Sequence, residues 1–143
     1  VNTGVSTEGP VQIAVRDMHV RHGIQVPVAD IRNLGHATHH LMDQKLGGHA
    51  DESETSVMLA VAPELVDLSK AVPDYGHMLD QPRSVFVAPV VFTGDPQAGT
   101  NYSAQGARGD PTLATVEKGR AVLAGMVDDL VAGLQPLCSG VRP

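Results

Sequence analysis

Histidines concentrate in one short part of the chain and are suited either to metal binding or to acid–base chemistry. The chain has seven His, and four of them lie between residues 36 and 49. His36, His39 and His40 follow the spacing i, i+3, i+4, which places side chains on roughly one face of an α-helix. Neutral imidazoles at this spacing are good ligands for zinc and similar metals. The same side chains are equally suited to hydrogen bonding at the surface or at an interface between subunits.

His49 is followed by the carboxylates Asp51, Glu52 and Glu54. A His beside carboxylates works either as a general acid or base with an orienting partner, or as part of a metal site. The Gly-Gly pair before His49 would let a ligand approach the backbone closely. Carboxylates at the start of a helix also simply complement its dipole, so this structural interpretation stays open as well.

A third polar group stands near the start of the sequence, where a possible strand runs into a helix. It comprises Asn2, Thr3, Ser6 and Thr7. In α/β sheets ligands bind at the carboxyl ends of strands, so these side chains are candidates for contact with an anionic or carbonyl group. Such residues are just as typical of helix caps. The same holds for Asp110, which precedes a proline as an N-cap residue does.

The composition argues against several functional classes. A net charge of −6 and only 3% aromatic residues argue against binding to nucleic acid. The single cysteine, Cys138, excludes an intrachain disulfide framework and a cysteine-based zinc motif. We see no apolar run near the ~20 residues that a membrane span needs, and no basic start leading into an apolar leader. We therefore expect a cytoplasmic protein with neither a nucleic-acid partner nor a membrane partner.

The first half of the chain is predicted to alternate between helix and strand. Thr7 is a plausible N-cap for a helix over about 8–22, and Gly23 fits the position just after its end. Alternating apolar residues over 24–28 predict a strand, which its proline weakens or places at a sheet edge. A short helical turn is expected over about 37–45.

The second half begins with the clearest capping signal. Asp51 is expected to cap a helix whose third position is acidic, and Pro63 to end it or to mark a second short turn. Residues 85–92 form a dense apolar run that favours β structure. The last helix is predicted to run from Asp110 to about Leu134, because Pro111 fits its first position and a second proline follows Leu134 closely. The alternation of elements indicates α/β layering in a single domain over residues 1–143.

Two motifs in the second and last thirds of the chain resemble the signature of a known family. The first spans residues 48–59 (GHADESETSVML) and continues at 62–66 (APELV). The second spans 109–115 (GDPTLAT) and continues with EKG at 117–119. Together, and in this order, they resemble the creatininase family, which comprises creatinine amidohydrolase and its relatives. The resemblance runs from Asn2 to about Leu134.

This resemblance implies a three-layer α/β/α sandwich, of which the chain matches the C-terminal portion. Part of the sheet and most of the usual metal ligands would then lie outside the sequence. Members of the family hydrolyse cyclic or linear amides, form homo-oligomers, often hexamers, and hold two divalent metals, zinc or manganese, that activate a water. His49 matches a histidine that assists proton transfer, and Glu54 matches the acidic residue that supports it.

The match departs from the family at its amino-terminal motif. Asn2-Thr3-Gly4 stands where typical members have Asn-Gly-His, and Gly4 has no side chain to bind a metal. Ser6 stands where creatininases have an acidic ligand, which resembles a branch with Asn-Thr-Gly-Val-Ser-Thr. We expect Asn2, Thr3 and Ser6 to contact substrate.

Two interpretations of this departure remain open. In the first, His36, His40 and Glu52 replace the lost metal ligands. In the second, the chain is a non-catalytic binding or scaffold subunit that has lost its metal site.

Overall fold

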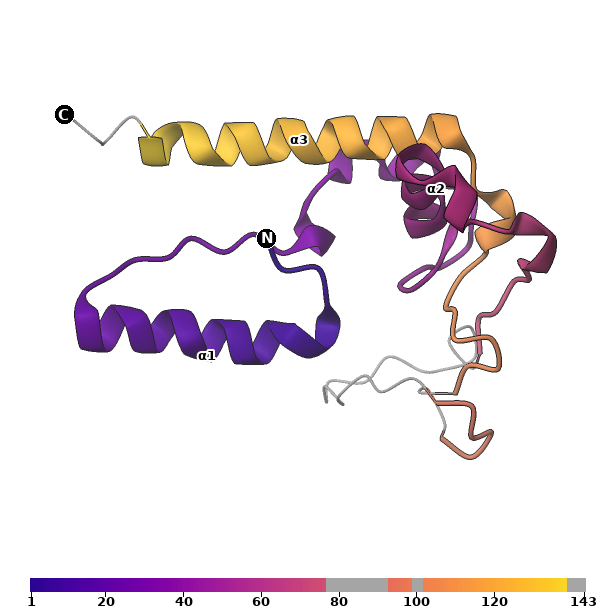
Figure 1. Ribbon diagram of the computed structural model, residues 1–143, viewed down its shortest axis with the longest axis horizontal. Helices are drawn as coiled ribbons and strands as arrows, with labels where there is room; N and C mark the ends of the chain where they lie inside the picture. Colours follow the sequence, from indigo (N-terminus) through magenta and orange to yellow (C-terminus); the bar gives the residue numbers. More distant parts are fainter. Residues whose placement is uncertain (77–92, 99–101, 139–143) are drawn as a thin grey trace. The chain divides into compact units, whose positions relative to one another are not determined.

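The computed structural model describes residues 1–76, 93–98 and 102–138, without the side chains of Val5 and Ser6. Its residues divide into two compact units: one contains Val1–His36 and Gly125–Pro143, and the other contains Ala37–Ala124. The α-helices of the described residues are α1 (Val5–His22), α2 (Glu52–Val61) and α3 (Val116–Cys138) (Figure 1). Between them lie short 3-10 helices: η1 (Ile31–Asn33), η2 (His36–Leu41), η3 (Pro63–Leu65), η4 (Leu68–Lys70) and η6 (Pro111–Leu113).

Across the three described ranges, β structure is limited to isolated bridges and there is no sheet. These bridges pair Asn2 with Asp30, His49 with Arg108, Asp74 with Gly109 and Thr93 with Tyr102. The strand predicted over 24–28 is wrong, because those residues have no regular ladder partner and a strand exists only through such pairing. The strand predicted over 85–92 lies outside the described residues. The sheet of the expected α/β/α sandwich is therefore absent from the described part of the chain.

α1 starts earlier than the sequence predicts but ends where expected. Gly4 occupies the N-cap position without a side-chain cap bond, so the prediction of Thr7 as the cap is wrong. The Thr7 hydroxyl instead donates to the Asn2 side chain at 2.6 Å. Gly23 adopts φ +66°, and its N–H donates to the His19 carbonyl at 2.9 Å. This left-handed conformation carries little penalty for glycine and terminates the helix.

α2 confirms the capping signal in its sequence. The Asp51 side chain accepts from the Glu54 N–H at 3.0 Å, which satisfies one of the donors left unpaired at a helix start. Pro63 opens the separate 3-10 turn η3, as the second predicted alternative required. The buried residues of α2 are Glu52 and Ser56, so the face that packs inward is polar at both positions.

The last helix is split where the sequence predicts continuity. Asp110 is a cap, but it caps the short η6 by accepting from the Thr112 N–H at 3.0 Å. α3 begins six residues later at Val116, where the Thr115 hydroxyl accepts from the Lys118 N–H at 3.1 Å. Two adjacent caps compete here, and the local signal alone does not say which one starts the long helix. α3 also continues through Pro136 to Cys138, past the end predicted near Leu134, although proline has no N–H to donate to the carbonyl four residues earlier.

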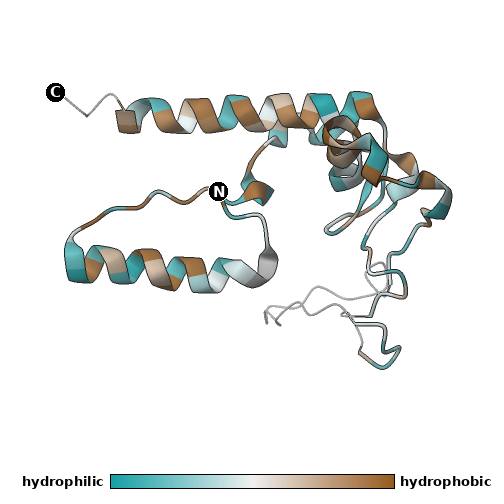
Figure 2. Ribbon diagram, viewed as in Figure 1, coloured by the Kyte–Doolittle hydropathy of each residue, from teal (hydrophilic) through white to brown (hydrophobic). Residues whose placement is uncertain are grey.

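α3 is also long and apolar enough, by length and composition, to cross a membrane. The exclusion of any such run from sequence was therefore too strong, although soluble core helices pass the same test. Figure 2 shows the apolar residues of α3 interrupted by hydrophilic ones. Asp128 and Asp129 lie within the helix, and an acidic side chain at a bilayer centre costs about 2.5–3.5 kcal/mol. The Asp129 carboxylate instead accepts from the Gly35 N–H at 2.7 Å within the same unit.

We expect Gly119→Ala to destabilise the protein by about 1–3 kcal/mol, because α3 packs directly against the α2 backbone at this position. A Cβ on Gly119 would lie far inside van der Waals contact with the Ser56 carbonyl group. Gly133 in the same helix offers a matched control, since a Cβ there would meet no described atom within 4 Å. Gly133→Ala should add up to about 1 kcal/mol through helix propensity alone. Urea denaturation measures both, and equal effects of the two substitutions would contradict the packing argument.

Candidate functional site

His49 is fixed in place by backbone pairing with a distant part of the chain. Its N–H donates to the Arg108 carbonyl at 3.3 Å, and the Arg108 N–H donates to the His49 carbonyl at 2.7 Å. Directly paired residues of an antiparallel bridge project their side chains to the same side. The bridge therefore places Arg108 beside His49. Sequence reasoning missed Arg108, whose only signal is its position next to the GDPTLAT motif. Burial lowers the pKa of its guanidinium.

Glu54 lies next to His49 and holds the backbone between them. Its Oε2 atom is 3.7 Å from the His49 Nδ1 atom and accepts from the Ala50 N–H at 2.7 Å. Ala50 adopts φ +45°, a left-handed conformation that a non-glycine residue takes up only when the surroundings impose it. The His49 and Glu54 side chains are about half exposed, so their contact adds little stability. The arrangement leaves a solvent-accessible imidazole with a carboxylate at one nitrogen.

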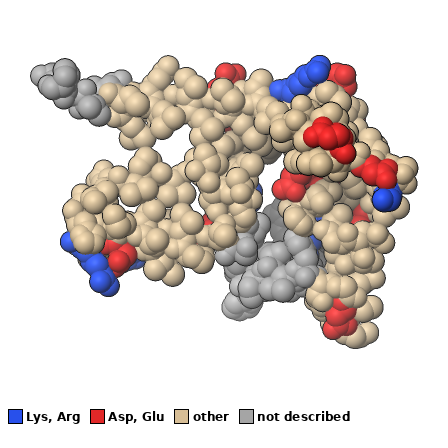
Figure 3. Space-filling model, viewed as in Figure 1, with Lys and Arg blue, Asp and Glu red and all other residues tan. Residues whose placement is uncertain are grey.

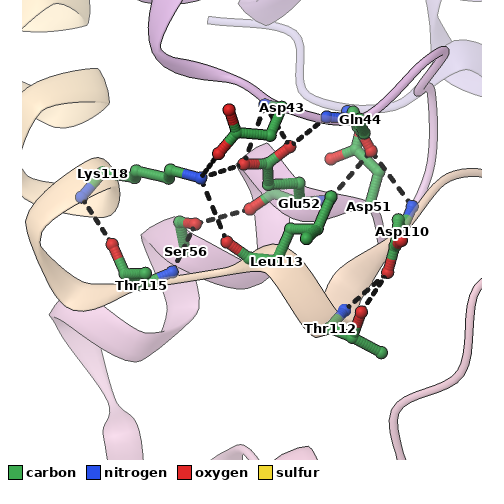
Figure 4. A network of polar contacts seen from close by, with 10 residues as sticks. All are labelled: Asp43, Gln44, Asp51, Glu52, Ser56, Asp110, Thr112, Leu113, Thr115 and Lys118. Atoms are coloured by element: carbon green, nitrogen blue, oxygen red, sulfur yellow. Dashed lines mark hydrogen bonds and ion pairs between the residues drawn. The ribbon is translucent and has the colours of Figure 1, made fainter.

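The side chain of Gln44 connects the segments around this pair (Figure 4). Its Oε1 atom accepts from the Glu52 N–H at 3.2 Å and from the Asp110 N–H at 3.1 Å. Its Nε2 atom donates to Asp51 Oδ2 at 2.9 Å, and the same oxygen accepts from the Gly48 N–H at 3.0 Å. One amide thus joins the loop before His49, the start of α2 and the start of η6. Sequence reasoning missed it, because Gln44 carries no local motif.

Two glycines, one just before the first motif and one at the start of the second, make room for this amide. A Cβ on Gly47 would overlap the side chains of Gln44 and Asp51. Gly109 has φ +141°, and a Cβ there would lie 2.5 Å from Asp51 Cβ and 2.6 Å from Gln44 Oε1. The space that we expected to admit a ligand at Gly47 is therefore occupied by protein. These positions need glycine for close packing.

Glu52 is fully buried, and its carboxylate is surrounded by donors of the protein (Figure 4). It accepts from the Asp43 N–H at 2.9 Å and from the Gln44 N–H at 2.7 Å, and it pairs with the Lys118 ammonium. Lys118 also contacts Asp43 at 2.7 Å and donates to the Leu113 carbonyl at 3.2 Å. Hydrogen bonds to Asp43 and Glu52 raise the pKa of Lys118. Glu52, proposed from sequence as a metal ligand, is thus engaged in an internal ion pair.

The predicted histidine cluster lies on a 3-10 helix, η2, instead of an α-helix. With three residues per turn, the side chains of His36 and His39 align, whereas His40 is rotated by about a third of a turn. The geometric argument for a shared face of all three therefore does not apply. The described ranges hold no group of three or more His, Cys, Asp or Glu that could bind a metal ion. Metal binding by His36, His40 and Glu52 stays a prediction.

The Asn2 side chain stabilises the loop that precedes α1 through hydrogen bonds. Its Nδ2 donates to the Gly4 carbonyl at 3.0 Å and to Asp30 Oδ2 at 3.1 Å, while its Oδ1 accepts from Thr7 at 2.6 Å. Thr3 is exposed, and the Ser6 side chain lies outside what the structure describes. Hydrogen bonds from Arg32 hold the pKa of Asp30 well below its usual range. Substrate binding by Asn2, Thr3 and Ser6 stays a prediction.

Asp74 organises the loop that carries Arg108. Its carboxylate accepts from the N–H groups of Gly76 at 2.9 Å and Gln105 at 3.0 Å, and from the Ser103 hydroxyl at 3.0 Å. Its backbone pairs with that of Gly109. Burial opposes ionisation, but these hydrogen bonds outweigh it and lower the pKa of Asp74.

We therefore expect Asp74→Asn to destabilise the protein most at neutral pH. A carboxylate whose pKa is lowered by folding stabilises the native state fully above its unfolded pKa, and this contribution is lost as pH falls through the folded value. The melting temperatures of the parent and the variant should accordingly begin to converge below about pH 4. Thermal melts at pH 7 and pH 3 measure the difference, and a constant gap would contradict the assignment.

Acidic and basic side chains are scattered in small groups over the face drawn in Figure 3. Among the described residues of that face there is no continuous basic stripe of the kind that follows a phosphate backbone. The candidate site is correspondingly mixed in charge: Glu54 and Arg108 flank His49.

The chain resembles known proteins along nearly all of its length. The family model described as creatininase, creatinine amidohydrolase, matches residues 1–134. A creatinine amidohydrolase homologue from Bacteroides fragilis shares the fold at TM-score 0.66 and 21% identity, over 96% of this chain and 51% of that one. A structure described as creatininase with Mn aligns at TM-score 0.60 and 27% identity, over 88% of this chain and 49% of that one.

A mutant creatininase complexed with creatine aligns at TM-score 0.59 and 27% identity, over 88% of this chain and 49% of that one. The chain therefore spans about half the length of these solved relatives. No curated protein matches it in sequence.

Proposed function

The chain belongs to the creatininase (creatinine amidohydrolase) family, and from this premise we propose that it serves the hydrolysis of an amide C–N bond with His49 as the acid–base group. The observation that carries the proposal is the 3.7 Å approach of Glu54 Oε2 to His49 Nδ1. The backbone of His49 is held by its bridge to Arg108, and both His49 and Glu54 belong to the motif at 48–59 that resembles the family signature.

The geometry supports a simple exchange of protons. A carboxylate facing Nδ1 favours the tautomer with hydrogen on Nδ1, so Nε2 is the nitrogen that accepts a proton. As water attacks the amide carbon, a C–O bond forms and His49 Nε2 takes the proton of the water. When the C–N bond breaks, the same nitrogen returns a proton to the departing amine, and the imidazole is regenerated. Glu54 stabilises the imidazolium between these steps.

The described residues do not by themselves supply a site for the divalent metals that the family resemblance implies. They contain no group of three or more suitable donors, Gly4 has no side chain, and Glu52 is engaged by Lys118. One relative is a creatininase described with Mn. We derive no step through zinc or manganese for this chain. Metal-activated water remains the sequence-based expectation, and its test is the metal content of the purified protein.

A second candidate function is a non-catalytic binding or scaffold subunit on the same fold. It is favoured by Gly4, which stands in place of the family histidine and has no side chain to bind a metal. Such a subunit would bind a small amide, and the family resemblance suggests a homo-oligomer, often a hexamer. Light scattering of the full chain measures that state directly.

The discriminating experiment incubates the full chain with creatinine, with and without added Mn²⁺ or Zn²⁺, and measures creatine formation. Turnover above that of heat-denatured protein supports the hydrolase. Saturable binding of creatinine without turnover under any metal condition supports the binding subunit and overturns the hydrolase for this substrate. Absence of both binding and turnover contradicts both candidates for this substrate.

A further inference from the structure

A groove of about 420 Å³ opens beside the His49–Glu54 pair. One wall is α2, which contributes Glu54 and Met58, and another is the segment from Leu65 to Val72. The volume falls in the range of small-ligand sites, about 300–1,000 Å³. Ala50, the residue in the left-handed conformation after His49, also lines it.

The lining of the groove is largely aliphatic and faces solvent. Met58, Leu65, Leu68 and Val72 are all exposed to water. Burying such side chains is favourable, by about 25 cal/mol for each Å² of apolar surface, so a contiguous exposed set favours an apolar occupant. Glu54 connects this surface with His49, because its carboxylate both lines the groove and approaches Nδ1.

The charges around the groove favour an uncharged occupant. Asp67 and Lys70 line it and pair with each other at 3.2 Å, so their charges cancel. Glu54, the remaining charged lining residue, is already engaged by the Ala50 N–H and faces His49. A neutral aliphatic chain would therefore be accepted without leaving a buried charge unpaired.

We propose that this groove binds the aliphatic group of an amide substrate, with the amide directed toward the Glu54 end. This proposal rests on the proposed hydrolase function and adds a substrate class to it: neutral aliphatic amides with a chain longer than that of acetamide. Each methylene buried in the groove should increase binding by up to about fourfold.

The first test observes the groove without requiring catalysis. The full chain is labelled with ¹³C at its methionine methyl groups, and the Met58 signal is assigned by loss in Met58→Leu. Hexanamide should shift the Met58 signal saturably, while acetamide at the same concentration leaves it in place. An unmoved Met58 signal overturns the proposal.

The second test compares kcat/KM for hexanamide and acetamide in the parent, Leu68→Asp and Val131→Asp. Val131 on α3 is exposed and lies outside the groove lining, so it is the matched control. We expect a preference for hexanamide of about tenfold or more in the parent and the control, and loss of it in Leu68→Asp. Hydrolysis with no chain-length preference overturns the proposal that the groove binds the aliphatic group, while the proposed hydrolase function stands.

The remaining outcomes separate the groove from the proposed function. A saturable Met58 shift without hydrolysis of either amide supports the groove and removes the hydrolase. In another outcome, the Met58 signal shifts with protein concentration and not with amide concentration, and light scattering shows dimerisation. This result assigns the groove to a second copy of the chain and overturns the substrate proposal.

Discussion

His49→Ala is expected to reduce amide hydrolysis by a factor of about 10²–10⁴, the usual contribution of a positioned acid–base group. The loss should appear in kcat, because the imidazole acts on protons that move only during bond formation and cleavage. The fold should persist, because the alanine variant keeps the backbone hydrogen bonds between residue 49 and Arg108. The His49 side chain is 48% exposed, so its truncation leaves no buried cavity.

Two further variants sharpen this prediction. Glu54→Gln keeps an acceptor for the Ala50 N–H but removes the charge beside Nδ1, so we expect a smaller fall in kcat with little change in stability. His22→Gln, in the last turn of α1, is the matched control and should leave kcat unchanged. Steady-state rates together with melting curves test all three. Full activity in a folded His49→Ala protein would eliminate the acid–base assignment.

Local signals predicted the start of α2 and the end of α1, but not the start of α1, where Gly4 and not Thr7 is the N-cap residue. Asp51 is the cap of α2 and Gly23 ends α1, because each acts on backbone groups within four residues. The prediction failed where two caps stood close together, at Asp110 and Thr115. It also failed over 24–28, because a strand depends on a partner that can lie anywhere in a sequence, and local alternation does not specify one.

The candidate site shows the same division between local and distant contacts. His49 and Glu54 are five residues apart, and their proximity follows from the start of α2. Arg108 lies 59 positions after its partner His49, and Lys118 lies 66 positions after its partner Glu52. No local sequence pattern encodes contacts over such separations. Gln44 is likewise recognisable only from the three segments that meet at its amide.

Lys118→Met is expected to cost about 3–5 kcal/mol, the usual effect of removing one partner of a buried ion pair. The Glu52 side chain is 0% exposed, and that of Lys118 is 18% exposed. Methionine keeps the length of the lysine stem but leaves the Glu52 charge without its ammonium partner. Urea denaturation of the parent and the variant measures the loss in the free energy of unfolding.

The control for this prediction is a lysine whose ion pair lies at the surface. Lys70 lies 3.2 Å from Asp67, with side chains 83% and 53% exposed, so Lys70→Met should cost less than about 1 kcal/mol. The double variant Glu52→Gln/Lys118→Met tests the mechanism: if the cost is the uncompensated charge, it should be more stable than Lys118→Met alone. Equal losses in the single and double variants would mean that Lys118 acts through packing of its stem. Glu52 also accepts hydrogen bonds from the N–H groups of Asp43 and Gln44, so an intact ion pair here helps to hold the loop before His49 in place.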